Sequence, residues 1–241
     1  MARGPRIQAV DLVRHVMARG NGRMAIFLDD RDYRQFVHFL GDVFDRFAIE
    51  CWNYCVMPNH YHATLQPREP NLSEAIRQLN SLYAQWWNKR QGRVGHVFQG
   101  RFKDQIVDGT EYLLALSKYV VLNPVRAGLV EHPDQWRWSS YAATMGLCSA
   151  PPFLSASTTL RLFGDGPEAV MRARFAKSVL EPQEDQGVVD RIRSNDRVLG
   201  DRAFKDSLGS LLHSVSESES PRPGSDGPDL IGRNSTAAPF R

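Results

Sequence analysis

Residues 52–65 constrain the fold of this chain more than any other stretch. They are apolar and β-prone on both sides of a Pro58-Asn59 turn, a pattern typical of two strands joined by a tight connection. His60 and His62 lie one residue apart in the second of these strands. Because side chains alternate between the two faces of a strand, both imidazoles project from one face and Tyr61 projects from the other. The stretch therefore predicts a sheet that carries a pair of imidazoles on one face.

This histidine pair has two interpretations. Two imidazoles side by side on a rigid sheet can share one divalent cation, if one more protein ligand and water complete its coordination. The alternative is a half-exposed polar pair without a metal, which is the commoner meaning of an isolated His-x-His pattern. The rest of the chain has to decide between them.

Hydrophobic spacing predicts a regular succession of strands and helices in the first part of the chain. Strands are expected over residues 10–18, 49–56, 60–66 and 100–107, and helices over 29–47, 71–90 and 111–123. Pro124 should end or kink the last of these helices at Asn123. The order of elements indicates an α+β fold, a ferredoxin-like (split βαβ) antiparallel sheet with helices on one face.

The pattern changes beyond residue 145. Short amphipathic segments at 168–179, 188–193 and 201–212 are separated by Pro and Gly and predict a small helical C-terminal extension over residues 146–212. Residues 213–241 are rich in Ser, Pro, Gly and charge and are expected to be disordered. The sequence thus suggests a first domain over 1–145, an extension and a tail.

Composition narrows the class of protein. An apolar content of 42% and a charged content of 24% are ordinary for a soluble domain, and a net charge of +3 indicates no particular partner. Three cysteines without a Cys-x-x-Cys pair favour a reducing compartment. No apolar run approaches the ~20 residues that span a bilayer, and no signal-peptide pattern opens the chain. We expect a cytoplasmic protein without a membrane partner.

The stretch between Glu74 and Asp104 contains no acidic residue. Its basic residues are candidates for DNA contacts: Arg77, Lys89, Arg90, Arg93, Arg101 and Lys103. Aromatic residues are interleaved with them, and basic groups neutralise phosphates while aromatic faces stack on unpaired bases. The alternative is a solvated cationic face whose aromatics belong to the core. Within the expected strand 100–107, Arg101 and Lys103 would share one face and act close to any reaction.

The last predicted helix carries Tyr112 and Tyr119 on one face, because they are seven residues apart. Both can belong to a core stripe, and a tyrosine can also act as a covalent nucleophile. Tyr119 differs from Tyr112 in having Asn123 one turn further along, with an amide oxygen that can ligate a hard cation. Opposite a histidine pair, these two residues would form a site for phosphoryl transfer.

Several ordered motifs resemble the single-tyrosine HUH transposases of bacterial insertion sequences. They are MPNHYH at 57–62, GHVFQGRFK at 95–103, EYLL at 111–114 and YVVLNPVRAGLV at 119–130. Residues 19–21 and 138–141 fit as well, so the resemblance covers roughly the first 145 residues. It is closest to the REP-associated tyrosine transposases, which act on short palindromic repeats. The middle residue of the HUH triplet is usually aliphatic and here is Tyr61, which faces away from the histidines.

The resemblance implies a function and a set of roles. His60 and His62 would bind Mg²⁺ or Mn²⁺, Asn123 would be a third ligand, and Tyr119 would be the nucleophile. Attack on single-stranded DNA that carries a hairpin or palindromic repeat would leave a 5′-phosphotyrosine and a free 3′-hydroxyl, so rejoining needs no ATP. The protein would act as a homodimer or a monomer.

Two other functions fit parts of the sequence. A relative that binds DNA hairpins without cutting them would not need His60, His62 and Tyr119 together. An RNA-binding module of the RRM type has the same predicted topology, but a strand that presents two histidines is a poor surface for stacking bases. Metal-dependent cleavage distinguishes the three functions.

Overall fold

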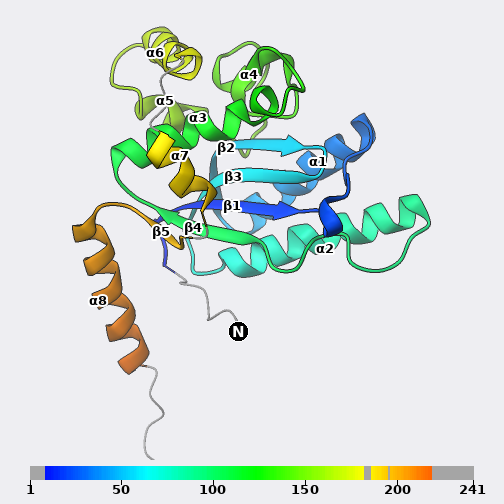
Figure 1. Cartoon of the computed structure of the whole chain (residues 1–241), viewed down its shortest axis with the longest axis horizontal. Helices are drawn as coiled ribbons and strands as arrows, with labels where there is room; N and C mark the ends of the chain where they lie inside the picture. Colours follow the sequence, from blue (N-terminus) through cyan, green and yellow to red (C-terminus); the bar gives the residue numbers. More distant parts are fainter. Residues whose placement is uncertain (1–8, 182–185, 195, 219–241) are drawn as a thin grey trace, which may run out of the picture.

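A five-stranded sheet forms the centre of the computed structural model, which describes residues 9–181, 186–194 and 196–218 (Figure 1). The strand order is β2-β3-β1-β4-β5. The strands are β1 (Val13–Arg19), β2 (Ile49–Met57), β3 (His60–Pro67), β4 (Lys103–Val107) and β5 (Val198–Leu199). Strands β1 to β4 pair with one another in antiparallel fashion. One other strand lies between the two strands that each of the helices α1 and α2 connects, as in a split βαβ unit. The predicted α+β class is confirmed.

The helices lie on both faces of this sheet. They are α1 (Asp30–Arg46), α2 (Leu72–Gln91), α3 (Thr110–Arg126), α4 (Tyr141–Thr144), α5 (Ala156–Arg161), α6 (Glu168–Leu180), α7 (Gln186–Arg193) and α8 (Arg202–Ser218), with short 3-10 turns at η1 (Asn21–Arg23) and η2 (Pro133–Gln135). Helix α1 passes behind the strands in Figure 1, whereas α7 passes in front of them. In the described part of the chain, no helix has the length and apolar character needed to cross a membrane.

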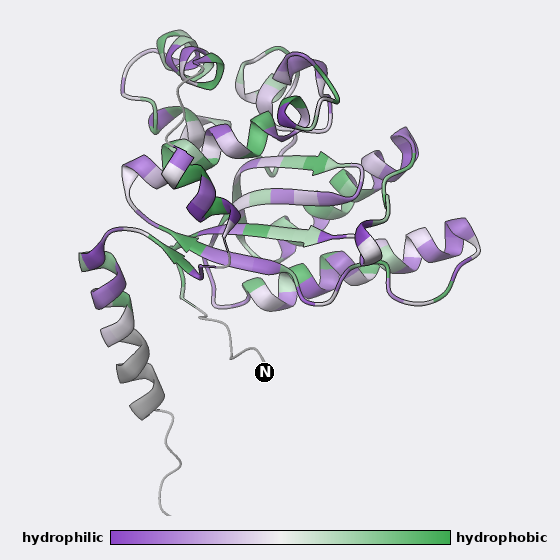
Figure 2. Cartoon of the chain, in the orientation of Figure 1, coloured by the Kyte–Doolittle hydropathy of each residue, from purple (hydrophilic) through white to green (hydrophobic). Residues whose placement is uncertain are grey.

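The expectation of helices on one face is wrong, because β2 is buried on both sides. Val56 packs into the core formed with α1 and α2, whereas Cys55 and Met57 pack into a second core under α3. Figure 2 accordingly shows a continuous green, hydrophobic stretch at the arrowhead end of β2. A strand that is apolar on both faces needs a cover on both, and α3 supplies the second one.

Helix α3 continues through Pro124 to Arg126, so the expectation that it ends at Asn123 is wrong. Proline removes one backbone donor from the last turn, which would leave helix carbonyls without a partner. Side chains take its place: Asn123 Nδ2 donates to the carbonyls of Tyr119 at 2.7 Å and Val120 at 3.4 Å. Arg126 Nη1 also donates to the Tyr119 carbonyl, at 3.0 Å. These contacts allow the helix to pass the proline.

Strand β4 is shorter than expected. It begins at Lys103, because Gly100 adopts a left-handed backbone with φ of 65°, which is incompatible with a strand. Arg101 therefore lies in an irregular segment before the strand, and the expectation that it shares a strand face with Lys103 is wrong.

The C-terminal extension contains the three expected helices, α6, α7 and α8, and also two elements that were not predicted, α5 and β5. Helix α4, which was not predicted either, lies just before the extension. Helix α8 runs to Ser218, past the expected boundary at 212, and the rest of the predicted disordered tail lies outside the described residues. Val188, Val189 and Ile192 of α7 pack with Leu116 of α3. The extension therefore shares a core with the first domain.

Two segments from beyond α3 run along the outer side of β2. Val56 N donates to the Trp138 carbonyl at 2.9 Å, and Ser155 N donates to the Cys51 carbonyl at 2.8 Å. The two segments thereby form isolated β-bridges with β2, one between Ser139 and Cys55 and one between Leu154 and Cys51. At the opposite edge of the sheet, β5 pairs in parallel with β4.

Candidate active site

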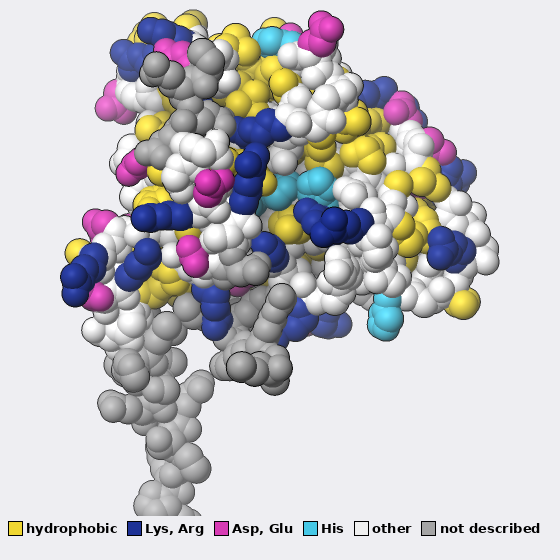
Figure 3. Space-filling model, in the orientation of Figure 1, with side chains coloured by type: hydrophobic (Ala, Val, Ile, Leu, Met, Phe, Trp, Pro, Cys, Tyr) yellow, Lys and Arg dark blue, Asp and Glu magenta, His cyan; other side chains and the backbone are white. Residues whose placement is uncertain are grey.

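A pocket of about 450 Å³ lies on the sheet face that α3 and α7 cover. Its lining residues are His15, Met17, Arg19, Met57, His60, His62, Lys103, Gln105, Tyr119, Asn123, Arg126, Ala127, Ile192 and Arg193. The strand residues among them follow the period of two, so three strands present alternate side chains to the same space. Figure 3 shows histidine side chains at the centre of this view with Lys and Arg side chains around them. The pocket unites His60, His62, Tyr119 and Asn123, as the sequence predicts.

The two histidines of β3 project from one face of the sheet. The ring centroids of His60 and His62 are 5.0 Å apart. Tyr61, between them, is buried on the other face, where its ring centroid lies 4.8 Å from that of Phe36. The alternation predicted for this strand is confirmed.

The hydrogen bonds of Asn59 determine the tautomer of His60, and so which ring nitrogen has a free lone pair. Asn59 Nδ2 donates to the Arg23 carbonyl at 3.0 Å, so its Oδ1 is the atom that faces His60 Nδ1, at 2.6 Å. An amide oxygen only accepts, so Nδ1 of His60 carries the proton. The Nε2 atom of His60 is then unprotonated and able to ligate a metal.

A third histidine, His15 of β1, was not predicted as part of the site. Its Nε2 lies 2.8 Å from His62 Nδ1, and the two rings stack with centroids 5.1 Å apart. Its Nδ1 lies 2.9 Å from Gln105 Oε1 of β4. Met17 is the register partner of both His62 and Lys103, which brings His15 diagonally next to His62. His15 and Gln105 could have been predicted as site residues only from the pairing register of β1 with β3 and β4. Hydrophobic spacing along a single strand does not give that register.

All three imidazoles are neutral at physiological pH. Burial lowers the pKa of His15 and the pKa of His60 to about 4 each, and the positive charge of Arg19 lowers that of His60 further. Burial, followed by the neighbouring imidazoles, lowers the pKa of His62 well below its ordinary value. Neutral imidazole is the form that binds metal ions.

Tyr119 reaches the same space from α3. Its ring stands edge-on to those of His62 and His15, with centroids 5.5 and 6.0 Å apart. The guanidinium carbons of Arg126 and Arg193 lie 5.1 and 5.9 Å from the centroid of the Tyr119 ring. A tyrosine ring beside two imidazoles and two guanidinium groups is a suitable environment for a phosphate diester.

The donor set suits a hard divalent cation. Asn123 uses its Nδ2 to bond helix carbonyls, so its Oδ1 is the end of the amide that can act as a ligand. Two imidazole nitrogens and an amide oxygen, completed by water, are compatible with Mg²⁺ or Mn²⁺. Among the described residues, no group of three or more His, Cys, Asp or Glu side chains is arranged to hold a metal. A site here would therefore depend on Asn123 or on DNA oxygens for its third ligand.

The basic residues predicted to contact DNA divide into two groups. Lys103 lines the pocket, whereas Arg77, Lys89, Arg90, Arg93 and Arg101 do not. Arg77 forms an ion pair with Glu74 on α2 at 3.6 Å, and the Arg93 guanidinium lies 5.6 Å from the Trp87 ring centroid. Lys89 and Arg101 are exposed. The acid-free stretch therefore does not form one surface around the site.

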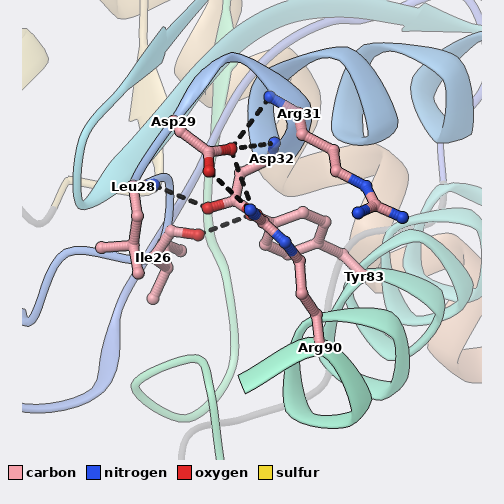
Figure 4. Close-up of polar contacts among 7 residues, drawn as sticks. All are labelled: Ile26, Leu28, Asp29, Arg31, Asp32, Tyr83 and Arg90. Atoms are coloured by element: carbon pink, nitrogen blue, oxygen red, sulfur yellow. Dashed lines mark hydrogen bonds and ion pairs between the residues drawn. The ribbon is translucent and has the colours of Figure 1, made fainter.

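Arg90 is engaged with the start of α1 (Figure 4). Its guanidinium bonds to Asp29 at 2.5 Å and to the fully buried carboxylate of Asp32. Asp32 also accepts a hydrogen bond from Leu28 N at 2.7 Å, and Tyr83 OH donates to the Ile26 carbonyl at 2.5 Å. These contacts join the end of α2 to the segment before α1. They indicate a structural role for Arg90, and its DNA contact stays a prediction.

Known proteins resemble this chain in sequence and in fold. Residues 8–123 match the family described as "Transposase IS200 like". A putative REP-associated tyrosine transposase of Haemophilus influenzae is 25% identical over 158 residues, which cover 58% of this chain and 90% of that protein. A solved structure of a REP-associated tyrosine transposase bound to a REP hairpin has a TM-score of 0.52 and 18% identity, covering 64% of this chain and 92% of the solved one. Over residues 8–123, this chain is therefore similar to the IS200-like transposases.

Proposed function

We propose that this protein cleaves and rejoins single-stranded DNA next to hairpins or palindromic repeats, with Tyr119 as the nucleophile. The observation that carries the proposal is the convergence of Tyr119 with His60 and His62 in one pocket, although the tyrosine comes from a helix and the histidines from a strand. The polar lining of this pocket suits a charged substrate. The reaction would take place in the cytoplasm, with the protein as a monomer or a homodimer.

The relatives support hairpin DNA as the substrate. The similar protein from Haemophilus influenzae is described as a REP-associated tyrosine transposase, and the solved relative is bound to a REP hairpin. By analogy, this chain would recognise a folded-back DNA element and cut the single strand beside it.

The proposed chemistry is an exchange of phosphodiester bonds. The hydroxyl oxygen of Tyr119 forms a bond to phosphorus, and the bond from phosphorus to the 3′ oxygen of the preceding nucleotide breaks. The products are a 5′-phosphotyrosine and a free 3′-hydroxyl, and attack by a 3′-hydroxyl reverses the step. Because the number of phosphate ester bonds does not change, no ATP is required.

The residues around Tyr119 would have separate tasks. His60 and His62 would hold Mg²⁺ or Mn²⁺ through Nε2, with Asn123 Oδ1 as a third ligand. When bound, the metal supplies Lewis-acid polarisation of a phosphate oxygen. Arg126 and Arg193 would hold the phosphate beside the tyrosine by charge-assisted hydrogen bonds.

The test is covalent capture of the DNA. The protein is incubated with labelled single strands that carry a hairpin, in the presence of Mn²⁺, and the mixture is run on a denaturing gel. A labelled adduct at the mass of the protein plus the cleaved strand is expected, and an unstructured strand of the same composition is the control. Binding of the hairpin without an adduct would instead indicate a DNA-hairpin-binding protein, and a preference for RNA would indicate the RRM-type alternative.

A further inference from the structure

We propose that His15 and Gln105 form a positioning relay that fixes the tautomer of His62, so that His62 presents Nε2 to the metal. The relay is defined as His62, His15, Gln105 and the backbone carbonyl of Asp196. The proposal rests on the proposed function, because that function supplies the metal. It assigns a role to two residues outside the predicted ligand set.

The relay is continuous from the pocket to the backbone. His62 Nδ1 lies 2.8 Å from His15 Nε2, and His15 Nδ1 lies 2.9 Å from Gln105 Oε1. Gln105 Nε2 donates to the Asp196 carbonyl at 2.9 Å, and the Arg191 carbonyl lies 3.4 Å from the same nitrogen. The distances along the relay are those of ordinary hydrogen bonds, whereas the contact with Arg191 is longer and weaker.

The direction of every hydrogen bond follows from the backbone end. A carbonyl only accepts, so the amide nitrogen of Gln105 must face Asp196 and its oxygen must face His15. His15 then carries its proton on Nδ1 and offers the lone pair of Nε2 to His62. His62 must therefore be protonated on Nδ1, which leaves its Nε2 unprotonated.

Burial of the relay residues enforces this assignment of donors and acceptors. His15, His62 and Gln105 are 4%, 3% and 4% exposed, so water cannot readily replace a missing partner. The opposite tautomer of His62 would place two lone pairs against each other at 2.8 Å and leave both without a donor. Outer partners of this kind orient the ligands of metal sites and set their affinity.

The anchor of the relay lies outside the segment that matches the family. Arg191 lies on α7 and Asp196 lies in the segment after it, whereas the match to the transposase family ends at residue 123. Lys103 Nζ also contacts this segment, at 3.3 Å from the Ser194 carbonyl. The C-terminal extension therefore contributes to the order of the histidines, although its side chains are not among the relay residues.

The first measurement uses the metal-free protein. Two-bond ¹H–¹⁵N spectra show which ring nitrogen carries the proton, and the signals of His62 are assigned by their loss in His62→Gln. A proton on Nδ1 of His62 and on Nδ1 of His15 is expected. A proton on Nε2 of His62, or a mixture of tautomers, would overturn the relay.

The second measurement is Mn²⁺ affinity by calorimetry. His15→Phe removes both contacts and should weaken binding about 10–100-fold. His15→Gln retains an acceptor towards His62 and a donor towards Gln105, and should restore most of the affinity. Val16→Ala, on the opposite face of β1, controls for general loosening of the strand and should leave the affinity unchanged.

The outcomes distinguish the relay from the proposed function. Equal Mn²⁺ affinity for His15→Phe and the unchanged protein would overturn the relay, as would an equal loss in Val16→Ala. If the unchanged protein binds no Mn²⁺ either alone or with a hairpin-bearing single strand, the proposed function fails, and the tautomer spectra still decide whether the relay exists.

Discussion

Arg191 of α7 donates a hydrogen bond of 2.5 Å to the hydroxyl of Tyr112 on α3. The two tyrosines on this side of α3 therefore have different surroundings. The hydroxyl of Tyr112 is engaged by the C-terminal extension, whereas the ring of Tyr119 borders the pocket beside His62. The pair offers a matched test of which tyrosine reacts.

Tyr119→Phe should lower formation of the DNA adduct by several orders of magnitude, because only the nucleophilic hydroxyl is lost. Binding of the hairpin should stay close to that of the unchanged protein. Tyr112→Phe should still form the adduct. Both quantities are measured by denaturing gels and by fluorescence anisotropy, and a covalent adduct in Tyr119→Phe would contradict the assignment.

Removal of the metal or of its ligands should abolish cleavage. His60→Ala, His62→Ala and EDTA treatment of the unchanged protein are each expected to eliminate the adduct, because the proposed site holds the metal through Nε2 of both histidines beside Tyr119. His38→Ala, an exposed histidine of α1, is the control. Undiminished cutting in chelator would refute the metal site.

Arg193 should act on the reaction more than on binding, because its guanidinium lies beside the Tyr119 ring. Arg193→Gln is expected to slow single-turnover cleavage at least 10-fold, a loss of about 1.4 kcal/mol of transition-state stabilisation. Lys89→Ala with Arg93→Ala should mainly weaken binding and flatten its salt slope by about 0.7 for each lost phosphate contact. If Arg193→Gln and the Lys89/Arg93 double variant changed the cleavage rate and the DNA affinity equally, the proposed division between reaction and binding would be contradicted.

Arg90→Ala should lower the midpoint of thermal unfolding, because it leaves the buried carboxylate of Asp32 without its cationic partner. Lys89→Ala, at the exposed neighbouring position, should leave the midpoint unchanged. Thermal scans followed by circular dichroism make the comparison. A midpoint unaffected by Arg90→Ala would indicate that the network in Figure 4 does not stabilise the fold.

The stability of the metal-free protein should fall on acidification. The pKa of His15 and that of His60 are about 4 in the folded chain, below the ordinary value of 6.5. Between these values the unfolded chain binds more protons, so stability rises with pH across this window and is complete above it. Each histidine contributes a slope of up to about 1.4 kcal/mol per pH unit.

Urea midpoints at pH 7, 6 and 5 in EDTA measure this dependence. His15→Gln removes one of the buried groups and should make the slope shallower. A midpoint that does not change between pH 7 and pH 5 would contradict the prediction.

The sequence predicted those features that depend on local periodicity. The spacing of Tyr33, Phe36 and Leu40 predicted α1, and the alternation around Tyr61 predicted the common face of the histidines. Tyr119 and Asn123 were placed together because one helical turn separates them. Each of these arguments needs only one element at a time.

Features that depend on two distant elements could not be predicted in this way. His15 joins the site through the register of β1 with β3, and Arg90 meets its carboxylates across 58 and 61 residues of chain. Arg193 lies on a helix whose existence was predicted but whose packing against α3 was not. The short strand β5 has too few residues to show any periodicity.

The segments that flank the sheet have a consequence for how copies of this chain can meet. A sheet with a bare outermost strand offers unpaired backbone groups on which another chain can add a strand, with aggregation as one result. Here β5 occupies the outer side of β4, and the bridges at Ser139 and Leu154 occupy positions along β2. A second copy that added a strand beside Cys51 and Cys55 of β2, or beside Ile106 and Val107 of β4, would have to displace one of these segments. Self-association would thus more readily use helices and loops, which leaves the strands that carry the histidines undisturbed.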